Sequence, residues 1–254
     1  MSFQVLNTSG YARRGELTTK TCAVQTPVFM PVGTYGTVKG LTPEHLHDIG
    51  FEIILGNAFH LHQRPGLETI KKFNGLHDFM GWNKSILTDS GGFQIWSLND
   101  LRKITEEGVE FKSPLDGSKI FMSPEDSIDT QLTLNSDIIM AFDECTDYPS
   151  SYEDAEQSMH LTHRWTERSL NYFQKHQKGH LLFGIVQGGM HEELRKQSLD
   201  FMNNLQLDGI ALGGLSVGEP KEEKTKILKC LAPMLPANKA HYVMGVGTPE
   251  ELVG

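Results

Sequence analysis

The stretch LLFGIVQ at residues 181–187 is apolar almost throughout and ends on the amide side chain of Gln187. A strand without alternation of apolar and polar residues suits burial on both faces, as in a parallel sheet. Leu194, Phe201 and Leu205 follow it at helical spacing. This strand-helix unit predicts an α/β fold, because parallel strands need crossover connections, which are usually helices.

Six other apolar runs end in the same way, on glycine or a polar residue. They cover residues 29–33, 52–56, 85–89, 137–143, 209–214 and 241–245. Seven such units favour a TIM (β/α)8 barrel, whose site collects residues from the ends of many strands. The alternative is a doubly wound sheet, which would concentrate its site at one switch point.

One connection is much longer than the others, between the strand ends at Asp89 and Asp143. Within it, residues 110–121 contain an Asp-Gly pair between two strand-like segments, which is typical of a hairpin turn. We therefore expect a β-hairpin insertion after the third strand of the barrel.

Several helix starts are readable. Hydroxyl residues precede proline at 42–43 and 123–124, which pairs a capping side chain with the first helical position. Ser150 and Glu153 have the spacing of a capping box that opens a helix to about Lys175. Thr248-Pro249 opens another helix close to the last residue. A barrel needs eight strands and seven are recognised, so we expect residues 1–254 to form a single incomplete TIM-barrel domain, truncated before its closing strand.

Composition narrows the class of protein. The 254 residues are 38% hydrophobic and 22% charged, which excludes a disordered chain, and no apolar run could span a bilayer. No secretory signal is recognised, so we expect a cytoplasmic protein without membrane partners. Cys22, Cys145 and Cys230 are too few and too widely spaced for a disulfide framework or a Cys-x-x-Cys zinc clip.

The net charge of −9 argues against nonspecific binding to nucleic acid. The charge is uneven, however. Residues 1–85 contain 8 basic and 6 acidic side chains, whereas residues 86–254 contain 15 basic and 26 acidic side chains. A local basic face is compatible with this distribution, so composition leaves nucleic-acid binding open.

Two strand ends carry carboxylates. TDSGGFQ at residues 88–94 places Asp89 after a buried strand, followed by two glycines that allow close approach of a ligand. Asp143-Glu144 follows the next strand of the expected barrel. The simpler interpretations are that Asp89 caps a helix and Asp143 pairs with a lysine. If both face one cavity, they could accept N–H groups from a guanine-like edge or act as acid and base at a glycosidic bond.

The remaining strand ends offer neutral groups. Gln187-Gly188-Gly189 supplies an amide that can donate to a carbonyl oxygen of a ligand. GGLSVGE at residues 213–219 exposes backbone groups, and MGVGTP at 244–249 leads into a helix N-terminus, which favours phosphate. Ordinary turns and a cap by Thr248 are the alternatives.

Five motifs follow or end the expected strands: TDSGGFQ (88–94), FDEC (142–145), GIVQGG (184–189), LGGLSVGE (212–219) and YVMGVG (242–247). Together they resemble the motifs of the tRNA-guanine transglycosylases, also called queuine tRNA-ribosyltransferases. The resemblance covers essentially the whole chain. The resemblance implies a TIM barrel that exchanges the wobble guanine of target tRNAs for 7-aminomethyl-7-deazaguanine in queuosine biosynthesis. Cys145 and Val217 resemble the bacterial form. The implied mechanism is a double displacement through a covalent ribosyl intermediate.

The resemblance also implies roles for individual residues. Asp89 would be the general acid/base, Asp143, Gln187 and Gly214 would read the base edge, Phe93 and Met244 would sandwich the base, and Leu215 would accept from its aminomethyl group. The complete set of implied substrate-binding residues is Ser90, Gly91, Gly92, Phe93, Asp143, Gln187, Gly214, Leu215 and Met244. The implied RNA-binding residues are Gly245, Val246, Gly247, Thr248, Pro249, Glu250 and Glu251.

Other family features are expected outside this sequence. The resemblance puts the nucleophilic aspartate shortly after Gly254 and a structural zinc site in a C-terminal subdomain further on, so no metal ligands are expected within residues 1–254. No cofactor is implied for the chemistry. The implied partners are the tRNA anticodon loop, a 7-deazaguanine base and a second copy in a homodimer. A noncatalytic binding subunit or an inactive fragment of the same fold is the alternative.

Overall fold

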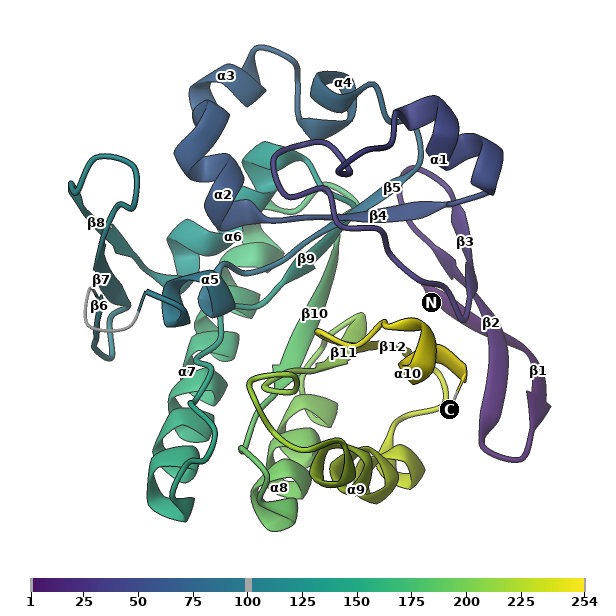
Figure 1. Ribbon diagram of the computed structural model, residues 1–254, viewed down its shortest axis with the longest axis vertical. Coiled ribbons are helices and arrows are strands. Elements are labelled where there is room, and N and C mark those ends of the chain that lie inside the picture. The colour runs from purple at the N-terminus through teal and green to yellow at the C-terminus, as the bar shows by residue number, and fades with distance from the viewer. Residues whose placement is uncertain (1, 99–101, 254) are drawn as a thin grey trace.

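The computed structural model describes residues 2–98 and 102–253. At its centre is a curled parallel sheet with helices along its outer face (Figure 1). In spatial order its strands are β12 (Ala240–Val243), β11 (Gly209–Leu212), β10 (Leu181–Val186), β9 (Ile138–Met140), β5 (Ser85–Thr88) and β4 (Ile53–Gly56). Almost every position in β4, β5, β9, β10 and β11 is buried, as their unbroken apolar sequences predict.

The first expected strand, residues 29–33, does not form. Only an isolated parallel bridge joins Val32 to Leu55, with the Gly33 N–H donating to the Leu55 carbonyl at 2.6 Å. Pro27 and Pro31 have no N–H group and limit ladder pairing here. Val32 is also 49% exposed, so this segment lies against β4 without being buried on both faces.

Helices cover the outer face of the sheet. The longer ones are α6 (Pro124–Leu134), α7 (Tyr152–His176), α8 (Glu192–Asn203) and α9 (Lys221–Leu231). Apolar side chains from these helices, including Phe173, Leu199 and Ile227, pack with Ile139 and Ile210 of the strands in one core cluster. Burial of these faces supplies most of the stability of such helices, since isolated helices of this length are marginal in water.

The remaining helices and helical turns are short; most of them flank β4 and β5, and the last two flank β12. They are α1 (Pro43–Ile49), α2 (Ala58–Leu61), the π-helical turn η1 (His62–Gly66), α3 (Leu67–Lys71), α4 (Leu76–Met80), α5 (Gly92–Trp96), the 3-10 turn η3 (Ala232–Met234) and α10 (Pro249–Val253). Thr42 and Ser123 cap α1 and α6 as expected. The cap of α7 is one residue later than expected, because Ser151 accepts from the Asp154 N–H.

The insertion after β5 is larger than a hairpin. It is a three-stranded antiparallel sheet of β6 (Arg102–Ile104), β7 (Val109–Lys112) and β8 (Lys119–Met122). The predicted hairpin is its β7–β8 pair, in which the Gly117 N–H donates to the Ser113 carbonyl at 2.9 Å and Gly117 has φ +73°.

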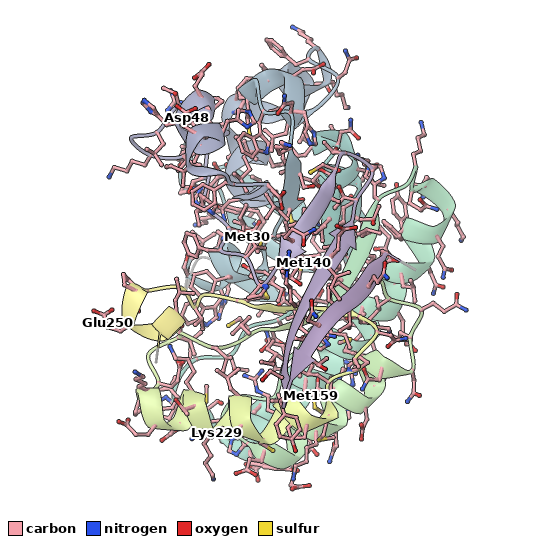
Figure 2. The ribbon with its side chains drawn as sticks, turned by 90° about the vertical axis from the view of Figure 1, so that its right-hand side faces the viewer. Met30, Asp48, Met140, Met159, Lys229 and Glu250 are labelled. Carbon is pink, nitrogen blue, oxygen red and sulfur yellow. The ribbon has the colours of Figure 1, made fainter. Side chains whose placement is uncertain are left out.

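A second antiparallel sheet, which the sequence patterns did not predict, covers the amino-terminal end of the parallel sheet. It consists of β1 (Phe3–Ser9), β2 (Ala12–Thr18) and β3 (Ala23–Thr26). Phe3, Leu17 and Val24 join the core cluster that contains Met140, and Figure 2 shows the strands of this sheet lying across the centre of the molecule near Met140. Arg13 donates to the Lys239 carbonyl at 2.6 Å, which ties this sheet to the segment before β12.

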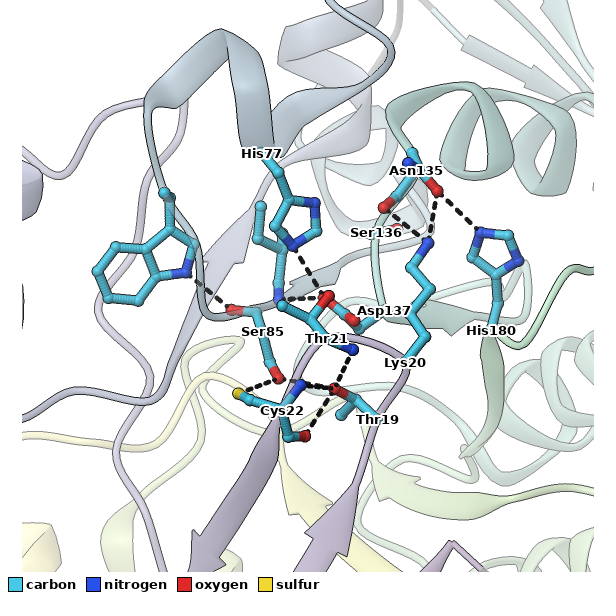
Figure 3. Close-up of polar contacts among 12 residues, drawn as sticks. Thr19, Lys20, Thr21, Cys22, His77, Ser85, Asn135, Ser136, Asp137 and His180 are labelled. Atoms are coloured by element: carbon cyan, nitrogen blue, oxygen red, sulfur yellow. Dashed lines mark hydrogen bonds and ion pairs between the residues drawn. The ribbon is translucent and has the colours of Figure 1, made fainter.

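A polar cluster lies at the same amino-terminal end (Figure 3). The fully buried Asp137 accepts from the Ile86 N–H at 2.9 Å and from His77 Nε2 at 3.1 Å. Burial by itself raises the pKa of Asp137, but the hydrogen bond from His77 and its other polar contacts keep the pKa below its ordinary value. Lys20 lies close by and donates to the Asn135 carbonyl at 3.0 Å. The cluster joins the N-terminal sheet to the starts of β5 and β9.

Candidate active site at the carboxyl ends of the strands

Asp89 follows β5 directly and is only 8% exposed. Its Oδ1 accepts from the Ala58 N–H at 2.8 Å, and its Oδ2 accepts from the side chains of Asn57 and Gln94, the latter at 2.9 Å. Burial raises the pKa of Asp89 to about 6, the nearby Asp143 adds to the rise, and the three hydrogen bonds oppose it. Asp89 is therefore a carboxyl group that can exchange a proton near neutral pH.

Asp143 follows β9 and is 6% exposed. Its Oδ1 accepts from the Ser90 hydroxyl at 2.7 Å, and its Oδ2 accepts from Gln187 Nε2 at 2.8 Å. Burial raises its pKa, and these two hydrogen bonds oppose the rise. Three strand ends that are distant in sequence therefore meet at one carboxyl group.

Ser90 is fixed from both sides. Its hydroxyl oxygen accepts from the Gly92 N–H at 3.1 Å, and its carbonyl accepts from the Ser127 hydroxyl at 2.7 Å. A Cβ atom on Gly92 would lie 2.5 Å from the Asp143 carbonyl oxygen, so the close approach of the two loops requires glycine there. Gly91 has φ +87°, a conformation that side chains rarely adopt.

The loops after β10 and β11 meet in a similar way. Gly214 has φ +58°, and a Cβ atom there would lie 2.3 Å from Gln187 Oε1. A cavity of about 250 Å³ adjoins Gly214 and extends to Val217 and Glu223 on one side and to the segment 146–150 on the other. The structure thus brings Asp89, Asp143, Gln187 and Gly214 to one edge of the sheet.

The remaining expected substrate-binding residues lie around this edge. Phe93 is 45% exposed, and its ring centroid is 5.1 Å from that of Trp96. The Met244 N–H donates to the Leu212 carbonyl at 3.1 Å, and a Cβ atom on Gly213 would lie 3.5 Å from Met244 Sδ. Leu215 is buried. No measured contact joins Phe93 to Met244, so their sandwich of a base stays a prediction.

The expected RNA-binding segment, residues 245–251, is bonded internally. The Glu251 carboxylate accepts from the N–H groups of Gly247 and Thr248, both at 3.0 Å, and pairs with Lys224. The hydrogen bonds from Lys224 and from these amides lower the pKa of Glu251 to about 2. An acidic side chain of the protein therefore holds the amides that were expected to favour phosphate.

Three residues of the site were not found by the sequence patterns. Asn57 and Gln94 contact Asp89 directly. Gln94 belongs to the TDSGGFQ motif, and Asn57 directly follows β4. Their positions after buried strands could have indicated that both belong to the site. The third, Arg195, lies in the first turns of α8 and is fully buried, at a position that nothing in the sequence distinguishes from a surface residue.

Within residues 2–98 and 102–253, no three His, Cys, Asp or Glu side chains gather as ligands. The residues described here thus offer no ligand set for the zinc that the resemblance implies. Over the same residues, no helix is long and apolar enough to cross a membrane.

The fold and the site define an α/β protein with a buried carboxylate pair at the carboxyl edge of a curled parallel sheet, an arrangement typical of enzymes. Comparison with known proteins gives the family. The sequence model described as queuine tRNA-ribosyltransferase matches residues 8–254. The chain belongs to this family.

Three relatives illustrate the similarity, and each is named queuine tRNA-ribosyltransferase. The protein from Dechloromonas aromatica (strain RCB) is 59% identical over all of this chain and 69% of its own length. The protein from Janthinobacterium sp. (strain Marseille) is 56% identical, again over all of this chain and 69% of its own length. That from Acinetobacter baumannii (strain ACICU) is 57% identical over 67% of its length.

Proposed function

We propose that this chain forms the base-recognition and acid/base part of a tRNA-guanine transglycosylase. The reaction would exchange the wobble guanine of target tRNAs for 7-aminomethyl-7-deazaguanine. The observation that carries the proposal is the buried Ser90–Asp143–Gln187 network beside Asp89. The three relatives named above support it, since all are named queuine tRNA-ribosyltransferase and are 56–59% identical to this chain.

Base recognition follows from the chemistry of the network. A carboxylate accepts two N–H groups, so Asp143 would bind the 1-NH and 2-amino group of guanine. Gln187 and the Gly214 amide would donate to the 6-oxo group. Asp143 is already bonded to Ser90 and Gln187, so the entering base would replace or share these hydrogen bonds. A site of this kind rejects bases that lack the matching polar groups, because its own buried groups would then lose their partners.

Proton transfer is assigned to Asp89. A pKa of about 6 lets it donate a proton to a leaving base and recover one from an entering base near neutral pH. Asn57, Gln94 and the Ala58 amide hold its two oxygens in fixed directions. Exchange with retained stereochemistry needs two displacements through a covalent ribosyl intermediate, and hence a separate nucleophile. By the family resemblance, that nucleophile is an aspartate that follows the position of Gly254.

The proposed architecture is the irregular TIM barrel of the family, of which the six-stranded curled sheet and the Val32–Leu55 bridge form the larger part. The proposed partners are the tRNA anticodon loop, the free 7-deazaguanine base and a second copy of the chain. A base in a single-stranded loop is the cheapest to flip into a pocket. We propose that the reaction takes place in the cytoplasm.

The test compares two proteins. One is residues 1–254 alone, and the other is residues 1–254 continued by the remaining C-terminal part of the Dechloromonas aromatica relative, which is 59% identical over the shared region. Incorporation of labelled guanine into unmodified tRNA is measured for both, and guanine binding is measured by equilibrium dialysis. We expect both to bind guanine and only the longer protein to exchange it.

Each component of the proposal can fail separately. If neither protein binds guanine, the recognition role of Asp143 and Gln187 is wrong. If residues 1–254 alone catalyse exchange at the rate of the longer protein, the nucleophile lies within them, and the assignment of Asp89 as acid/base has to be revised. A longer protein that binds both guanine and tRNA but exchanges nothing would favour the noncatalytic binding subunit.

A further inference from the structure

Arg195 is a fully buried arginine that no acidic side chain neutralises directly. Within the part of the chain that the structure describes, no carboxylate oxygen lies within 4.0 Å of its guanidinium. It also lies in the first turns of α8, where the helix dipole disfavours a cation. Burying such a charge is expensive unless hydrogen bonds compensate for it, so the position of Arg195 needs an explanation.

The guanidinium instead donates to four backbone carbonyls in and beside two loops. It donates to Val186, the last residue of β10, at 2.9 Å, and to Gly189 in the loop that follows at 2.7 Å. In the loop after β11 it donates to Gly213 at 2.6 Å and to Gly214 at 3.0 Å. One planar group therefore connects the two loops that carry Gln187 and Gly214.

These bonds fix the directions of the amides as well as of the carbonyls. In a trans peptide the C=O and the following N–H point in opposite directions. The Val186 carbonyl points to Arg195, and the Gln187 N–H correspondingly reaches Ser198 Oγ at 3.1 Å on another side. By the same geometry, holding the Gly213 carbonyl directs the Gly214 N–H away from Arg195. This N–H has no acceptor among residues 2–98 and 102–253.

We propose that Arg195 is a positioning residue that holds the Gly213–Gly214 peptide so that its N–H donates to the 6-oxo group of a bound purine. The inference rests on the proposed function, and it extends that function from the residues that touch the base to the buried residue that orients one of them. Packing agrees with it, because a Cβ atom on Gly214 would lie 3.2 Å from Arg195 Nη2 and 2.3 Å from Gln187 Oε1. The Gly214 peptide is therefore enclosed by Arg195 and Gln187 together.

The test compares two ligands with the 254-residue chain. Guanine has the 6-oxo group, and 2-aminopurine lacks both this group and the 1-NH, so the quantity compared is the change in their affinity ratio between proteins that all keep Asp143. Equilibrium dialysis gives the ratio of the two affinities for the wild type, Arg195→Lys and Arg195→Met. Lysine keeps the charge but cannot reach both loops with a planar fork, and methionine keeps most of the volume. We expect the guanine to 2-aminopurine ratio to fall about tenfold in both variants, the size of effect expected for one buried hydrogen bond.

The outcomes are distinct. If Arg195 served folding alone, its substitution would weaken the binding of both ligands equally and leave the ratio of their affinities unchanged. That result would overturn the inference. Arg168→Lys is the matched control, because Arg168 also donates to backbone carbonyls, those of Glu106 and Glu107, in the connection between β6 and β7. It should leave the ratio at its wild-type value. A wild type that binds neither ligand would contradict the proposed function instead.

A measurement on the wild type covers the case in which the Arg195 variants do not fold. Hydrogen exchange of the Arg195 guanidinium is followed by NMR in arginine-labelled protein with each ligand at saturation. If the Gly214 amide couples Arg195 to the 6-oxo group, guanine slows this exchange more than 2-aminopurine does. Equal protection by the two ligands would overturn the inference.

Discussion

Strand β9 has an aspartate at each end, and the two carboxyl groups shift in opposite directions. Asp137, at the amino end, is held below its ordinary pKa, whereas Asp143, at the carboxyl end, is raised above it. Both are buried, and burial raises the pKa of each, but their hydrogen-bond partners differ. His77 and a backbone amide stabilise the charge of Asp137, whereas among the described residues the side chains bonded to Asp143 are the neutral Ser90 and Gln187.

The comparison separates a structural carboxylate from one that is available to a ligand. Asp137 accepts hydrogen bonds from His77 and the Ile86 amide at one of its oxygens, and its cluster joins three elements (Figure 3). The Asp143 network, with Asp89 beside it, places two carboxyl groups close together, and no cationic side chain of residues 2–98 and 102–253 is bonded to either. Within a TIM-like fold, residues at the amino ends of strands generally serve stability and those at the carboxyl ends serve chemistry.

The largest effect is expected at Asp143. Asp143→Asn should weaken guanine binding by up to about 10⁴-fold, because an amide accepts at only one of its two terminal atoms. The unfolding free energy should not fall, since the fold already favours the uncharged form of this group. Equilibrium dialysis and thermal unfolding measure the two quantities. Undiminished guanine binding would show that Asp143 is structural, like Asp137.

Asp89→Asn is expected to reduce base exchange about 10²- to 10⁴-fold in the longer protein, with guanine affinity nearly unchanged. Its measurement is the rate of labelled-guanine incorporation at saturating guanine. A variant whose rate falls only through weaker binding would contradict the acid/base assignment.

The raised pKa of Asp89 also predicts a pH dependence of stability. The folded state binds the proton more tightly than the unfolded state, whose pKa is about 3.9. The resulting stabilisation is complete below pH 3.9 and is lost as the pH rises through about 6. The unfolding free energy should fall by about 3 kcal/mol over this pH range, and this fall should be absent in Asp89→Asn. Urea unfolding at a series of pH values would measure it. Parallel curves for the two proteins would show that the pKa of Asp89 is not raised.

Asp137 precedes β9, at the end opposite to Asp143. Asp137→Asn should lower the unfolding free energy by about 3 kcal/mol, because the substitution removes the buried charge that His77 and the Ile86 amide stabilise. Guanine affinity should not change. The pKa of Asp137 is lowered, so its stabilisation exists above its unfolded pKa and is lost as the pH falls through the folded pKa. Urea unfolding at pH 7 and pH 3 checks this, and the difference between wild type and variant should shrink at the lower pH.

The smallest effect is expected for Lys20→Met, below about 1 kcal/mol in unfolding free energy. Lys20 donates to the Asn135 carbonyl at an exposed position, and His77 and the backbone hold Asp137 without it. Urea unfolding would measure it. A loss as large as that of Asp137→Asn would mean that Lys20 carries the charge balance of this cluster.

Much of the fold could be predicted from the sequence, because its signals are local. Continuous apolar runs identified the six strands of the parallel sheet, and hydroxyl-proline pairs identified three helix starts. The signal failed where the local pattern was ambiguous. Residues 29–33 read as a strand although two prolines limit pairing there, and the N-terminal sheet and β6 lack a strong apolar pattern.

The site was predictable in part for the same reason. Carboxylates and amides that directly follow buried strands must gather at one edge of a parallel sheet, so Asp89, Asp143 and Gln187 could be named from sequence. Their roles stay predictions that the proposed experiments test. The resemblance to a family added Gly214 and Phe93, which residue type alone would not have singled out.

The sequence by itself determined which residues end the strands, since apolar periodicity and capping act over a few neighbouring positions. Only the tertiary structure decided what those residues contact. Asn57 and Gln94 donate hydrogen bonds to Asp89, and Arg195 donates to carbonyls of two loops. Glu251 accepts from amides at the start of its own helix. The physical reason is that pKa shifts and hydrogen-bond directions depend on burial and on partners distant in sequence, such as Ser90 and Asp143, which are 53 residues apart.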